Sequence, residues 1–297
     1  MKQILITGLN SYIGSSFINF INKSSDCKDY NIVQLDVSNN EWIKFDFSGF
    51  DTVIHVAGIV HRKVKDQSLY YNVNSYLTLE IAKKSKSSGV THFIFMSTIS
   101  VYGKLNGTIS IDTEFNPKNN YAKSKLKGEI LLKQLESDSF KLSIVRPPLV
   151  YGINCKGNYV RLVNLSKYSI LLPKYTNQRD MIYIDNLSLF IKKIIDKKIN
   201  GIILPSDGFS WSTNEIFTFY RDIMGKRTLY LPLSAIAVKI LIKFIKNVKK
   251  VYGDFVLSSE INNKNSSIFN DGSDLRMNKE MIKHVLKEKT LNENFIS

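Results

Sequence analysis

Tyr121 and Lys125 are four residues apart in a segment with helical periodicity, so both side chains are expected on one helix face. An ammonium group beside a phenol lowers the pKa of the phenol because it favours the phenolate. A tyrosine tuned in this way can pass a proton to or from a substrate oxygen while a hydride moves to or from the attached carbon. Chance surface pairs have the same spacing, so this interpretation depends on the residues that accompany it.

A glycine-framed turn near the start of the chain favours the redox interpretation. Residues 3–6 predict a buried strand, residues 7–11 a turn, and the stretch to about residue 22 a helix. Glycines in such a turn let backbone amides and the helix N-terminus approach a pyrophosphate, whose charge the helix dipole favours. Ser11 replaces the middle glycine of the usual G-x-x-G-x-x-G pattern, and its hydroxyl can donate to a phosphate. The predicted pyrophosphate-binding residues are Gly8, Ser11, Tyr12, Ile13 and Gly14, and a tight turn without a ligand is the alternative.

Two aspartates after the first turn are candidates for holding an adenosine. Asp36 lies 22 residues after Gly14, at the end of a second expected strand. A carboxylate at this place accepts hydrogen bonds from ribose hydroxyls and repels a 2′-phosphate, which favours NAD(H) and leaves NADP(H) open. Asp46, with Phe47 beside it, is expected to accept a hydrogen bond from the amine of adenine. A strand-end carboxylate and a solvated loop aspartate without these roles are the alternatives.

Strands and helices alternate through the first half of the chain. The expected strands are residues 3–6, 31–35, 51–57, 92–96 and 141–145, and later helices are expected at 69–88 and 120–137. This alternation predicts a Rossmann-type, doubly wound α/β fold with a parallel sheet covered by helices on both faces. Such sheets bind ligands beyond the carboxyl ends of their strands. Residues that follow strands at that edge complete the predicted cofactor site: Ala57, Gly58 and Pro148.

The pattern loosens after about residue 150, which predicts a smaller C-terminal α/β lobe. We expect residues 1–150 to form the dinucleotide-binding domain, with about 180–205 returning to it, and residues 151–179 and 206–297 to form a substrate-binding lobe. Helices are expected at 158–168 and 213–224, the second capped by Ser212 or Thr213. Short strands are expected at 181–184 and 202–204, with a helix from Asp185 between them.

Three residues of this lobe are candidates for substrate contacts. Arg179 precedes an expected strand and can clamp a diphosphate with two parallel hydrogen bonds. A surface ion pair with Asp180 is the alternative. Asn158 and Arg161 open an expected helix with Tyr159, where an amide and a guanidinium can meet a nucleotide. Helix capping and solvent exposure are the alternative for these two.

The composition excludes several classes of protein. Among 297 residues, a 43% hydrophobic content argues against disorder. Cys27 and Cys155 are far apart and outside any C-x-x-C pattern, which fits the cytoplasm, and the four histidines lack metal-ligand spacing. No apolar run is long enough for a signal peptide or a membrane span. The net charge of +15 comes without a nucleic-acid-binding motif, so biased composition or attraction to acidic small molecules or anionic membrane surfaces is favoured over nucleic-acid binding.

One basic segment has helical periodicity. Residues 233–251 place lysines at 239, 243, 246 and 250 as a single stripe, opposite apolar residues that include Ile236, Ile240, Phe244 and Ile245. A basic amphipathic helix of this kind can lie on anionic lipid, which predicts weak association with a membrane surface. A solvated face over a buried one is the alternative.

In order along the chain, these motifs resemble the extended short-chain dehydrogenase/reductase superfamily, and within it the NAD-dependent epimerase/dehydratase family that acts on nucleotide sugars. The resemblance spans about residues 2–190. The motifs are Thr7-Gly8-x-x-Ser11-x-x-Gly14, Asp36, Val53-Ile-His-Val-Ala-Gly58, Ser97-Thr-Ile-Ser-Val-Tyr-Gly103, Tyr121-x-x-x-Lys125, Arg146-Pro-Pro-Leu-Val-Tyr-Gly152 and Arg179-Asp-x-Ile-Tyr-Ile-Asp185.

The resemblance implies a role for each catalytic candidate. Tyr121 would be the acid/base at a UDP-sugar, Lys125 would hold the nicotinamide ribose and tune Tyr121, and Thr98 would complete the catalytic triad at the substrate. Family members often form homodimers through two helices, here 69–88 and 120–137, although the apolar positions of these helices could equally be internal core. A dehydratase typically has an Asp-Glu pair directly after the catalytic Ser/Thr, and Ile99-Ser100 stand there instead.

A narrower resemblance is to capsular-polysaccharide 4-ketoreductases of the N-acetylfucosamine route. It is carried by the phrases Phe93-Ile-Phe-Met-Ser-Thr98, Asn116-Pro117, Cys155-Lys-Gly-Asn158 and Gly253-Asp-Phe-Val256. It implies reduction of a UDP-4-keto-6-deoxy-N-acetylhexosamine in surface-polysaccharide synthesis. A UDP-hexose 4-epimerase with a retained NAD is the second expectation, and a non-catalytic dinucleotide sensor is a remote third.

Overall fold

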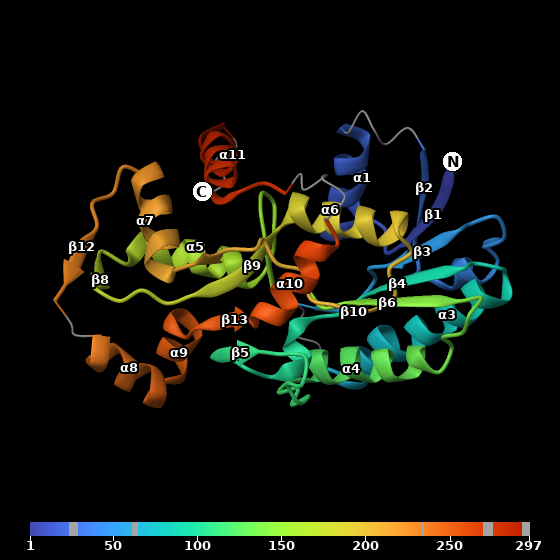
Figure 1. The fold of residues 1–297 in the computed structure, drawn as a ribbon, viewed down its shortest axis with the longest axis horizontal. Coiled ribbons are helices and arrows are strands. Elements are labelled where there is room, and N and C mark those ends of the chain that lie inside the picture. The colour runs from blue at the N-terminus through green and yellow to red at the C-terminus, as the bar shows by residue number, and fades with distance from the viewer. Residues whose placement is uncertain (24–28, 61–64, 233–234, 270–275, 293–297) are drawn as a thin grey trace. The chain divides into compact units, whose positions relative to one another are not determined.

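The structure, a computed structural model, describes residues 1–23, 29–60, 65–232, 235–269 and 276–292 (Figure 1). The chain divides into two compact units. The first unit holds residues 1–103, 115–147 and 184–205, and the second holds residues 104–114, 148–183 and 206–297. Cys27 and His61 lie outside the described residues.

A six-stranded sheet, parallel throughout, forms the centre of the first unit. Its order is β10-β6-β4-β3-β1-β2. The strands are β1 (Lys2–Thr7), β2 (Tyr30–Leu35), β3 (Thr52–His55), β4 (His92–Met96), β6 (Lys141–Val145) and β10 (Gly201–Ile203). The central strands read as short apolar runs because both faces of a parallel sheet are covered. The predicted parallel α/β sheet is confirmed.

Helices cover both faces of this sheet. α1 (Tyr12–Lys23) and α6 (Ile184–Asp196) pack together on one face, and α3 (Thr78–Ser87) and α4 (Asn120–Lys133) pack together on the other (Figure 1). Between the second face and the sheet lies an apolar core that includes Phe47, Phe93 and Phe95. Short helices η2 (Asn40–Ile43) and η4 (Ile99–Tyr102) lie in the connections.

Two predicted helices differ in detail from the structure. The stretch expected as one helix at 69–88 consists of α2 (Ser68–Tyr71), a π-helix η3 (Asn72–Leu77) and then α3. The helix expected to reach residue 137 ends at Lys133, because a bridge between Ser137 and Phe140 turns the chain back into β6.

The second unit has its own small sheet, of order β11-β9-β13-β5, with β7 beside β9. The strands are β5 (Gly107–Ile109), β7 (Leu149–Tyr151), β9 (Arg179–Tyr183), β11 (Ser210–Trp211) and β13 (Phe255–Leu257), and a separate ribbon pairs β8 (Leu171–Pro173) with β12 (Leu229–Leu231). The helices are α5 (Asn158–Tyr168), α7 (Thr213–Ile223), α8 (Ala235–Phe244), α9 (Lys246–Tyr252), α10 (Ser259–Ser267) and α11 (Lys279–Asn292).

The boundaries between the units differ from the expectation in two places. Residues 104–114, expected in the first domain, belong to the second unit because β5 pairs with β13. The strand expected at 181–184 does not return to the large sheet. It is β9 of the second unit, and only α6 and β10 return.

The basic segment is two helices rather than one. α8 ends at Phe244, and α9 begins at Lys246 after Ile245 adopts an extended backbone with φ of −107°. The predicted single stripe of lysines is therefore broken, and residues 233–234 lie outside the described residues. Within the described chain no helix is both long and apolar enough to span a membrane.

Candidate active site

The turn between β1 and α1 is built on two glycines. Gly8 has φ of +118°, and a Cβ on it would lie 2.8 Å from the backbone nitrogen of Ala57, so only glycine lets β1 and the end of β3 approach so closely. A Cβ on Gly14 would lie 2.6 Å from the Ser11 Oγ. The first turn of α1 therefore presents bare backbone at the carboxyl edge of the sheet, as a pyrophosphate requires.

Ser11 caps helix α1. Its Oγ accepts a hydrogen bond from the Gly14 amide at 3.2 Å. A hydroxyl that accepts one hydrogen bond keeps its proton, so Ser11 can still donate to a phosphate as predicted. The geometry accommodates a dinucleotide pyrophosphate at this turn, with Tyr12 and Ile13 in the same helical turn.

Asp36 follows β2 directly and is ionised. Its carboxylate accepts a hydrogen bond from the Ser38 amide at 2.8 Å, and hydrogen bonds from Ser38 lower the pKa of this carboxyl group below its ordinary value. Asp46 is exposed and is bound by Ser48 in the same way. The side chain of Phe47, however, is fully buried in the core. Its ring therefore cannot line an adenine site, and only its backbone can.

Lys125 projects from α4 to the carboxyl end of β4. Its Nζ donates to the Met96 carbonyl oxygen at 2.9 Å and lies 4.6 Å from the centroid of the Phe95 ring. Burial lowers the pKa of this lysine to about 7, although the carboxylate of Glu129, one turn further along the helix, opposes the shift. Lys125 is thus a buried amine that titrates near neutrality.

Tyr121 lies one helical turn before Lys125 and next to Thr98. Burial raises the pKa of its phenol to about 12, and a hydrogen bond with Thr98 lowers it. The predicted lowering by Lys125 is therefore wrong for this structure: desolvation is the larger effect. The predicted convergence is present, because Thr98 follows β4 and lies within hydrogen-bonding reach of the phenol.

Thr98 is held by its own turn. Its Oγ1 caps η4 by accepting from the Ser100 amide at 3.2 Å and donates to the Ser100 Oγ at 3.2 Å. The side chain is 7% exposed, so it can turn between this partner and a ligand oxygen only within a confined space. Together with Tyr121 it forms a pair of hydroxyl groups able to bind and protonate one oxygen atom.

Asn74 is a site residue that the sequence reasoning missed. From η3, its Oδ1 accepts from the Ile59 amide at 2.8 Å, and its Nδ2 donates to the Ile59 carbonyl at 3.1 Å and to the Ser124 Oγ at 3.0 Å. It thereby ties the loop after β3 to α4. A Cβ on Gly58, in this loop, would lie 2.9 Å from the Asn74 Oδ1 and 3.2 Å from the Lys125 Nζ. A larger residue at position 58 would therefore displace the side chain of Asn74 or Lys125.

A buried ion pair behind Lys125 was also missed. Arg146 donates from Nε to the Glu129 carboxylate at 3.0 Å and from a terminal nitrogen to the Tyr102 hydroxyl at 2.7 Å, and Ser97 donates to the same carboxylate. Arg146 and Glu129 are each about 1% exposed. Tyr102 is buried in the core. The spacing of Glu129 four residues after Lys125 was the available signal.

Arg179 binds backbone in the second unit. It donates to the carbonyl oxygens of Lys250 and Val251, at 3.0 and 3.2 Å, at the C-terminal end of α9. The carboxylate of Asp180 instead accepts from the Leu257 amide at 2.7 Å and from the Ser210 hydroxyl. Arg179 therefore forms neither the predicted diphosphate clamp nor the alternative ion pair with Asp180. Its guanidinium caps the C-terminal end of α9, where the helix carbonyl groups disfavour an anion.

The roles predicted for the other residues of the second unit remain predictions. Asn158 and Arg161 are exposed in the first turn of α5, and Pro148 is buried at the start of this unit. Tyr159 is buried, and its hydroxyl lies 3.1 Å from that of Tyr220, so it packs the lobe.

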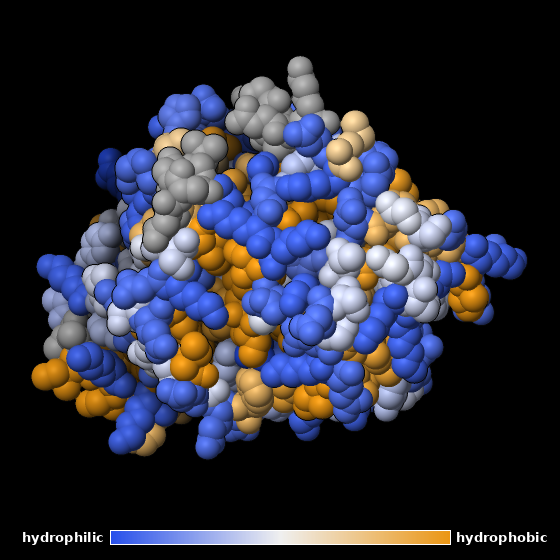
Figure 2. Space-filling model, turned by 45° about the vertical axis from the view of Figure 1, so that its right-hand side comes forward, coloured by the Kyte–Doolittle hydropathy of each residue, from blue (hydrophilic) through white to orange (hydrophobic). Residues whose placement is uncertain are grey.

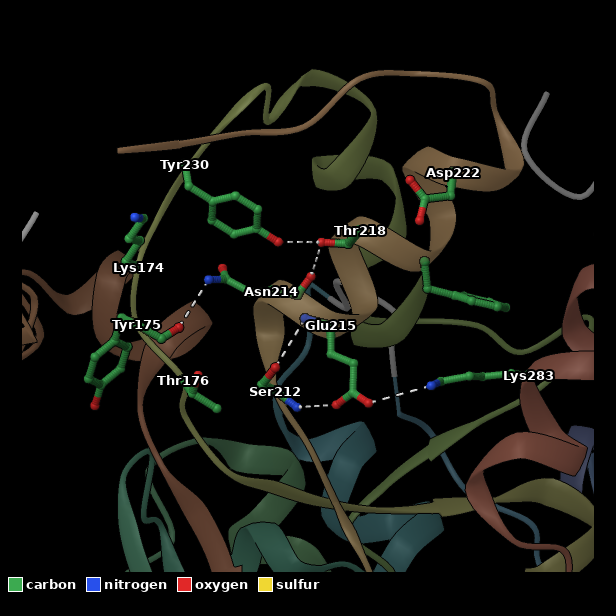
Figure 3. A pocket seen from close by; sticks show the side chains of 11 residues that line it. Lys174, Tyr175, Thr176, Ser212, Asn214, Glu215, Thr218, Asp222, Tyr230 and Lys283 are labelled. Carbon is green, nitrogen blue, oxygen red and sulfur yellow. Dashed lines mark hydrogen bonds and ion pairs between the residues drawn. The ribbon is translucent and has the colours of Figure 1, made fainter. Parts of the chain in front are cut away.

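The second unit holds a cavity of about 750 Å³, and none of the predicted site residues is among those that line it (Figure 3). It is lined by residues of α7, of the segment after β8, of β12 and of α11, including Tyr175, Asn214, Tyr230 and Lys283. Glu215 on its wall is bound within a capping box and by Lys279, so this charge serves the structure of α7. In the described part of the chain no three His, Cys, Asp or Glu residues are grouped to hold a metal ion.

Comparison with known proteins identifies the family of this chain. The sequence profile of the NAD dependent epimerase/dehydratase family matches residues 4–203. A UDP-glucose 4-epimerase of Vibrio cholerae is 31% identical over 260 residues, covering 78% of this chain and 79% of that protein. The N-acetyl-alpha-D-glucosaminyl-diphospho-ditrans,octacis-undecaprenol 4-epimerase of Escherichia coli O157:H7 is 27% identical over 211 residues, covering 64% of this chain and 62% of that protein. The UDP-glucuronic acid 4-epimerase of Bacillus cereus, solved with NAD, superposes with a TM-score of 0.73 at 20% identity and covers 99% of this chain and 100% of that chain. This chain belongs to the NAD-dependent epimerase/dehydratase family.

Proposed function

We propose that this protein transfers a hydride at C4 of a UDP-sugar, with Tyr121 as the acid/base. The observation that carries the proposal is the grouping of Tyr121 with Thr98 and Lys125 at the carboxyl end of β4. Proton transfer to or from a sugar oxygen needs a group within hydrogen-bonding distance of that oxygen. Because the pKa of the Tyr121 phenol is about 12, the phenol is protonated at neutral pH and can donate its proton.

The residues around the β1–α1 turn accommodate a dinucleotide. The first turn of α1 would hold the pyrophosphate, Asp36 the adenosine ribose, and Lys125 together with Tyr121 the nicotinamide ribose. A bound nicotinamide would supply or accept the hydride. The ionised carboxylate of Asp36 would repel a 2′-phosphate, so NAD(H) is favoured over NADP(H).

Reduction of a UDP-4-keto-6-deoxy-N-acetylhexosamine in surface-polysaccharide synthesis is the reaction we put first. Its support is the set of short phrases around Cys155–Asn158 and Gly253–Val256, which resemble 4-ketoreductases. The E. coli relative named above acts on a sugar attached to undecaprenol, which accords with assembly of a surface polysaccharide. Ile99 and Ser100 at the dehydratase positions argue against dehydration.

A UDP-hexose 4-epimerase is the second candidate, and a specific observation favours it. The V. cholerae relative at 31% identity is named a UDP-glucose 4-epimerase. An epimerase would use the same Tyr121 twice, first as base and then as acid, on a keto-sugar that turns over within the site.

The two reactions differ in their use of cofactor. Purified protein would be given NADH with a UDP-4-keto-6-deoxy-N-acetylhexosamine, and separately UDP-GlcNAc or UDP-glucose without reductant. A reductase consumes NADH in a one-to-one ratio with the keto-sugar, which the absorbance of NADH reports. Interconversion of UDP-GlcNAc and UDP-GalNAc without added reductant would instead establish the epimerase.

Replacing Tyr121 tests the acid/base assignment in either reaction. We expect Tyr121→Phe to lower kcat by about 10²–10⁴-fold, because it deletes the proton donor while keeping the ring. Tyr168→Phe, at an exposed tyrosine of α5, is the matched control and should retain wild-type turnover. Full activity of the Tyr121 variant would refute the assignment. Wild-type protein that binds NAD(H) but turns over neither substrate would instead favour a non-catalytic dinucleotide sensor.

A further inference from the structure

Helix α8 exposes an apolar stripe. Ile236, Ile240 and Phe244 are 70%, 53% and 76% exposed and follow one another at the four-residue spacing of a helix face. Leu241 and Ile245 enlarge this surface. Figure 2 shows the apolar patch at the lower left, at the height of α8 in Figure 1. Single exposed apolar residues are ordinary, but a contiguous set on one helix marks an interaction surface.

The stripe is not the face that packs α8 onto the protein. Val238 and Ile242, which are nearly fully buried, form that face and contact a small cluster with Tyr175, Val248 and Tyr252. The exposed stripe is therefore additional apolar surface beyond what the fold uses. A helix that is apolar on both its inner and its outer side requires a second partner for the outer side.

The charge around the stripe is uniformly positive. Lys239 and Lys243 flank it on α8, and Lys246, Lys249 and Lys250 follow on α9, whereas residues 235–253 contain no aspartate or glutamate. Lys243 reaches over the ring of Phe244, with its Nζ 5.6 Å from the ring centroid. The same sign of charge extends to the whole chain, whose net charge is +15.

We propose that α8 and α9 form a docking surface for an anionic lipid bilayer, with the stripe inserted at the level of the headgroups. Apolar residues on one side and lysines on the flank are what an interfacial helix needs, because the first enter the acyl boundary and the second pair with anionic headgroups. A second copy of the chain fits less well, since a two-fold interface would bring the lysines of both copies together. The docking surface is independent of the catalytic assignment.

Vesicle sedimentation tests the proposal. The full chain would be mixed with vesicles of phosphatidylcholine alone, or of phosphatidylcholine and phosphatidylglycerol at roughly three to one. We expect binding only to the anionic vesicles at low salt, and release at high salt because the electrostatic part is screened. Ile236→Ser/Ile240→Ser/Phe244→Ser should abolish binding, and Lys239→Gln/Lys243→Gln/Lys246→Gln should weaken it roughly 100-fold.

Matched variants separate this surface from general effects. Ile43→Ser/Ile111→Ser removes two exposed apolar residues elsewhere, and Lys123→Gln/Lys127→Gln/Lys133→Gln removes the same charge from the exposed face of α4. Both should bind vesicles like the wild type, or weaken only slightly, and all variants should keep the wild-type thermal unfolding temperature. The proposal is overturned if the wild type does not bind anionic vesicles at low salt, or if the controls lose binding equally. It is also overturned if the α8 substitutions change only the oligomeric state in sedimentation velocity.

Discussion

Lys125 and Tyr121 both lie in surroundings that favour their neutral forms. Burial lowers the pKa of the lysine to about 7 and raises that of the tyrosine to about 12. The opposing contributions are local: Glu129 favours the charged lysine, and Thr98 favours the phenolate. The main group that favours the ammonium is the Glu129 carboxylate, which is already paired with Arg146. A further anion near Lys125 would therefore favour the charged form of the lysine.

The low pKa of Lys125 predicts how protein stability depends on pH. Between the folded pKa of about 7 and the ordinary value of 10.5, the unfolded chain carries a proton on this lysine and the folded protein does not. Unfolding therefore takes up a proton, and Lys125 makes the wild type more stable as pH rises through this window. Lys125→Met lacks this contribution. The free energy of unfolding of Lys125→Met minus that of the wild type should therefore fall by about 1.4 kcal/mol for each unit that the pH rises within this window.

Urea unfolding of both proteins at several pH values between 7 and 10 would measure this difference. Lys123→Met, at an exposed lysine on the same helix, is the control and should follow the wild type at every pH. Parallel stability curves for wild type and Lys125→Met would contradict the low pKa.

At the residue scale, spacing in the sequence predicted which side chains lie close together, but it did not predict how deeply they are buried. The four-residue interval of Tyr121 and Lys125 was enough to place both on one face of α4, and the strand before Thr98 placed its hydroxyl beside them. Burial depends on residues far away in the chain, so the direction of the Tyr121 pKa shift could not be read from that interval. Arg179 shows the same limit: its partners lie more than 70 residues away.

The π-helix η3 is the element that joins the loop after β3, which holds Gly58, to helix α4. Through it, Asn74 holds Ile59, and the Ser75 hydroxyl donates to the Ser124 carbonyl oxygen at 2.7 Å. π-helical turns are rare and often lie at functional sites. The apolar periodicity of residues 69–88 predicted one continuous helix, because a local widening of the helix leaves no distinct mark in a short pattern.

Asn74→Ala tests this connection. The substitution leaves the Ile59 amide and carbonyl groups without their partner, which should cost about 1–3 kcal/mol of stability. It also frees the loop that carries Gly58, so we expect NAD(H) affinity to fall by roughly tenfold. Thermal unfolding and the quenching of protein fluorescence by NADH would measure the two effects.

Asn72→Ala is the matched control, since Asn72 lies on the same π-helix with its side chain exposed. It should change neither quantity by more than a few tenths of a kcal/mol. Equal losses in both variants would mean that the π-helix as a whole, rather than the Asn74 contacts, determines cofactor affinity.

At the scale of the whole molecule, the chain passes repeatedly between two units. The alternation of strands and helices was enough to predict the parallel sheet of the first unit, because helices such as α1, α3 and α6 lie between successive strands and cover the sheet. The sheet of the second unit is made of strands of two to five residues from five separate parts of the chain. Strands so short carry too little pattern to predict their pairing, and for this reason the transfer of residues 104–114 to the second unit was missed.

This division predicts that the second unit can lose structure while the first keeps it. β13 lies between β9 and β5, and the amide of Leu257 in β13 donates to the buried carboxylate of Asp180 in β9. Leu257→Pro removes this donor and breaks the central ladder, which should cost roughly 3 kcal/mol or more within the second sheet. Leu257→Met keeps the amide and nearly the same volume, so it should behave almost as the wild type.

Hydrogen exchange followed by mass spectrometry distinguishes the units by peptide. In Leu257→Pro, peptides covering β7, β9 and β13 should exchange faster, whereas those covering β1, β3 and β4 should keep wild-type protection, because all six strands of the first sheet pair only with one another. Local opening of this kind is expected where one group of contacts can be lost without the rest. Equal acceleration in both sets would contradict this prediction and would show that the two units unfold as a single cooperative structure.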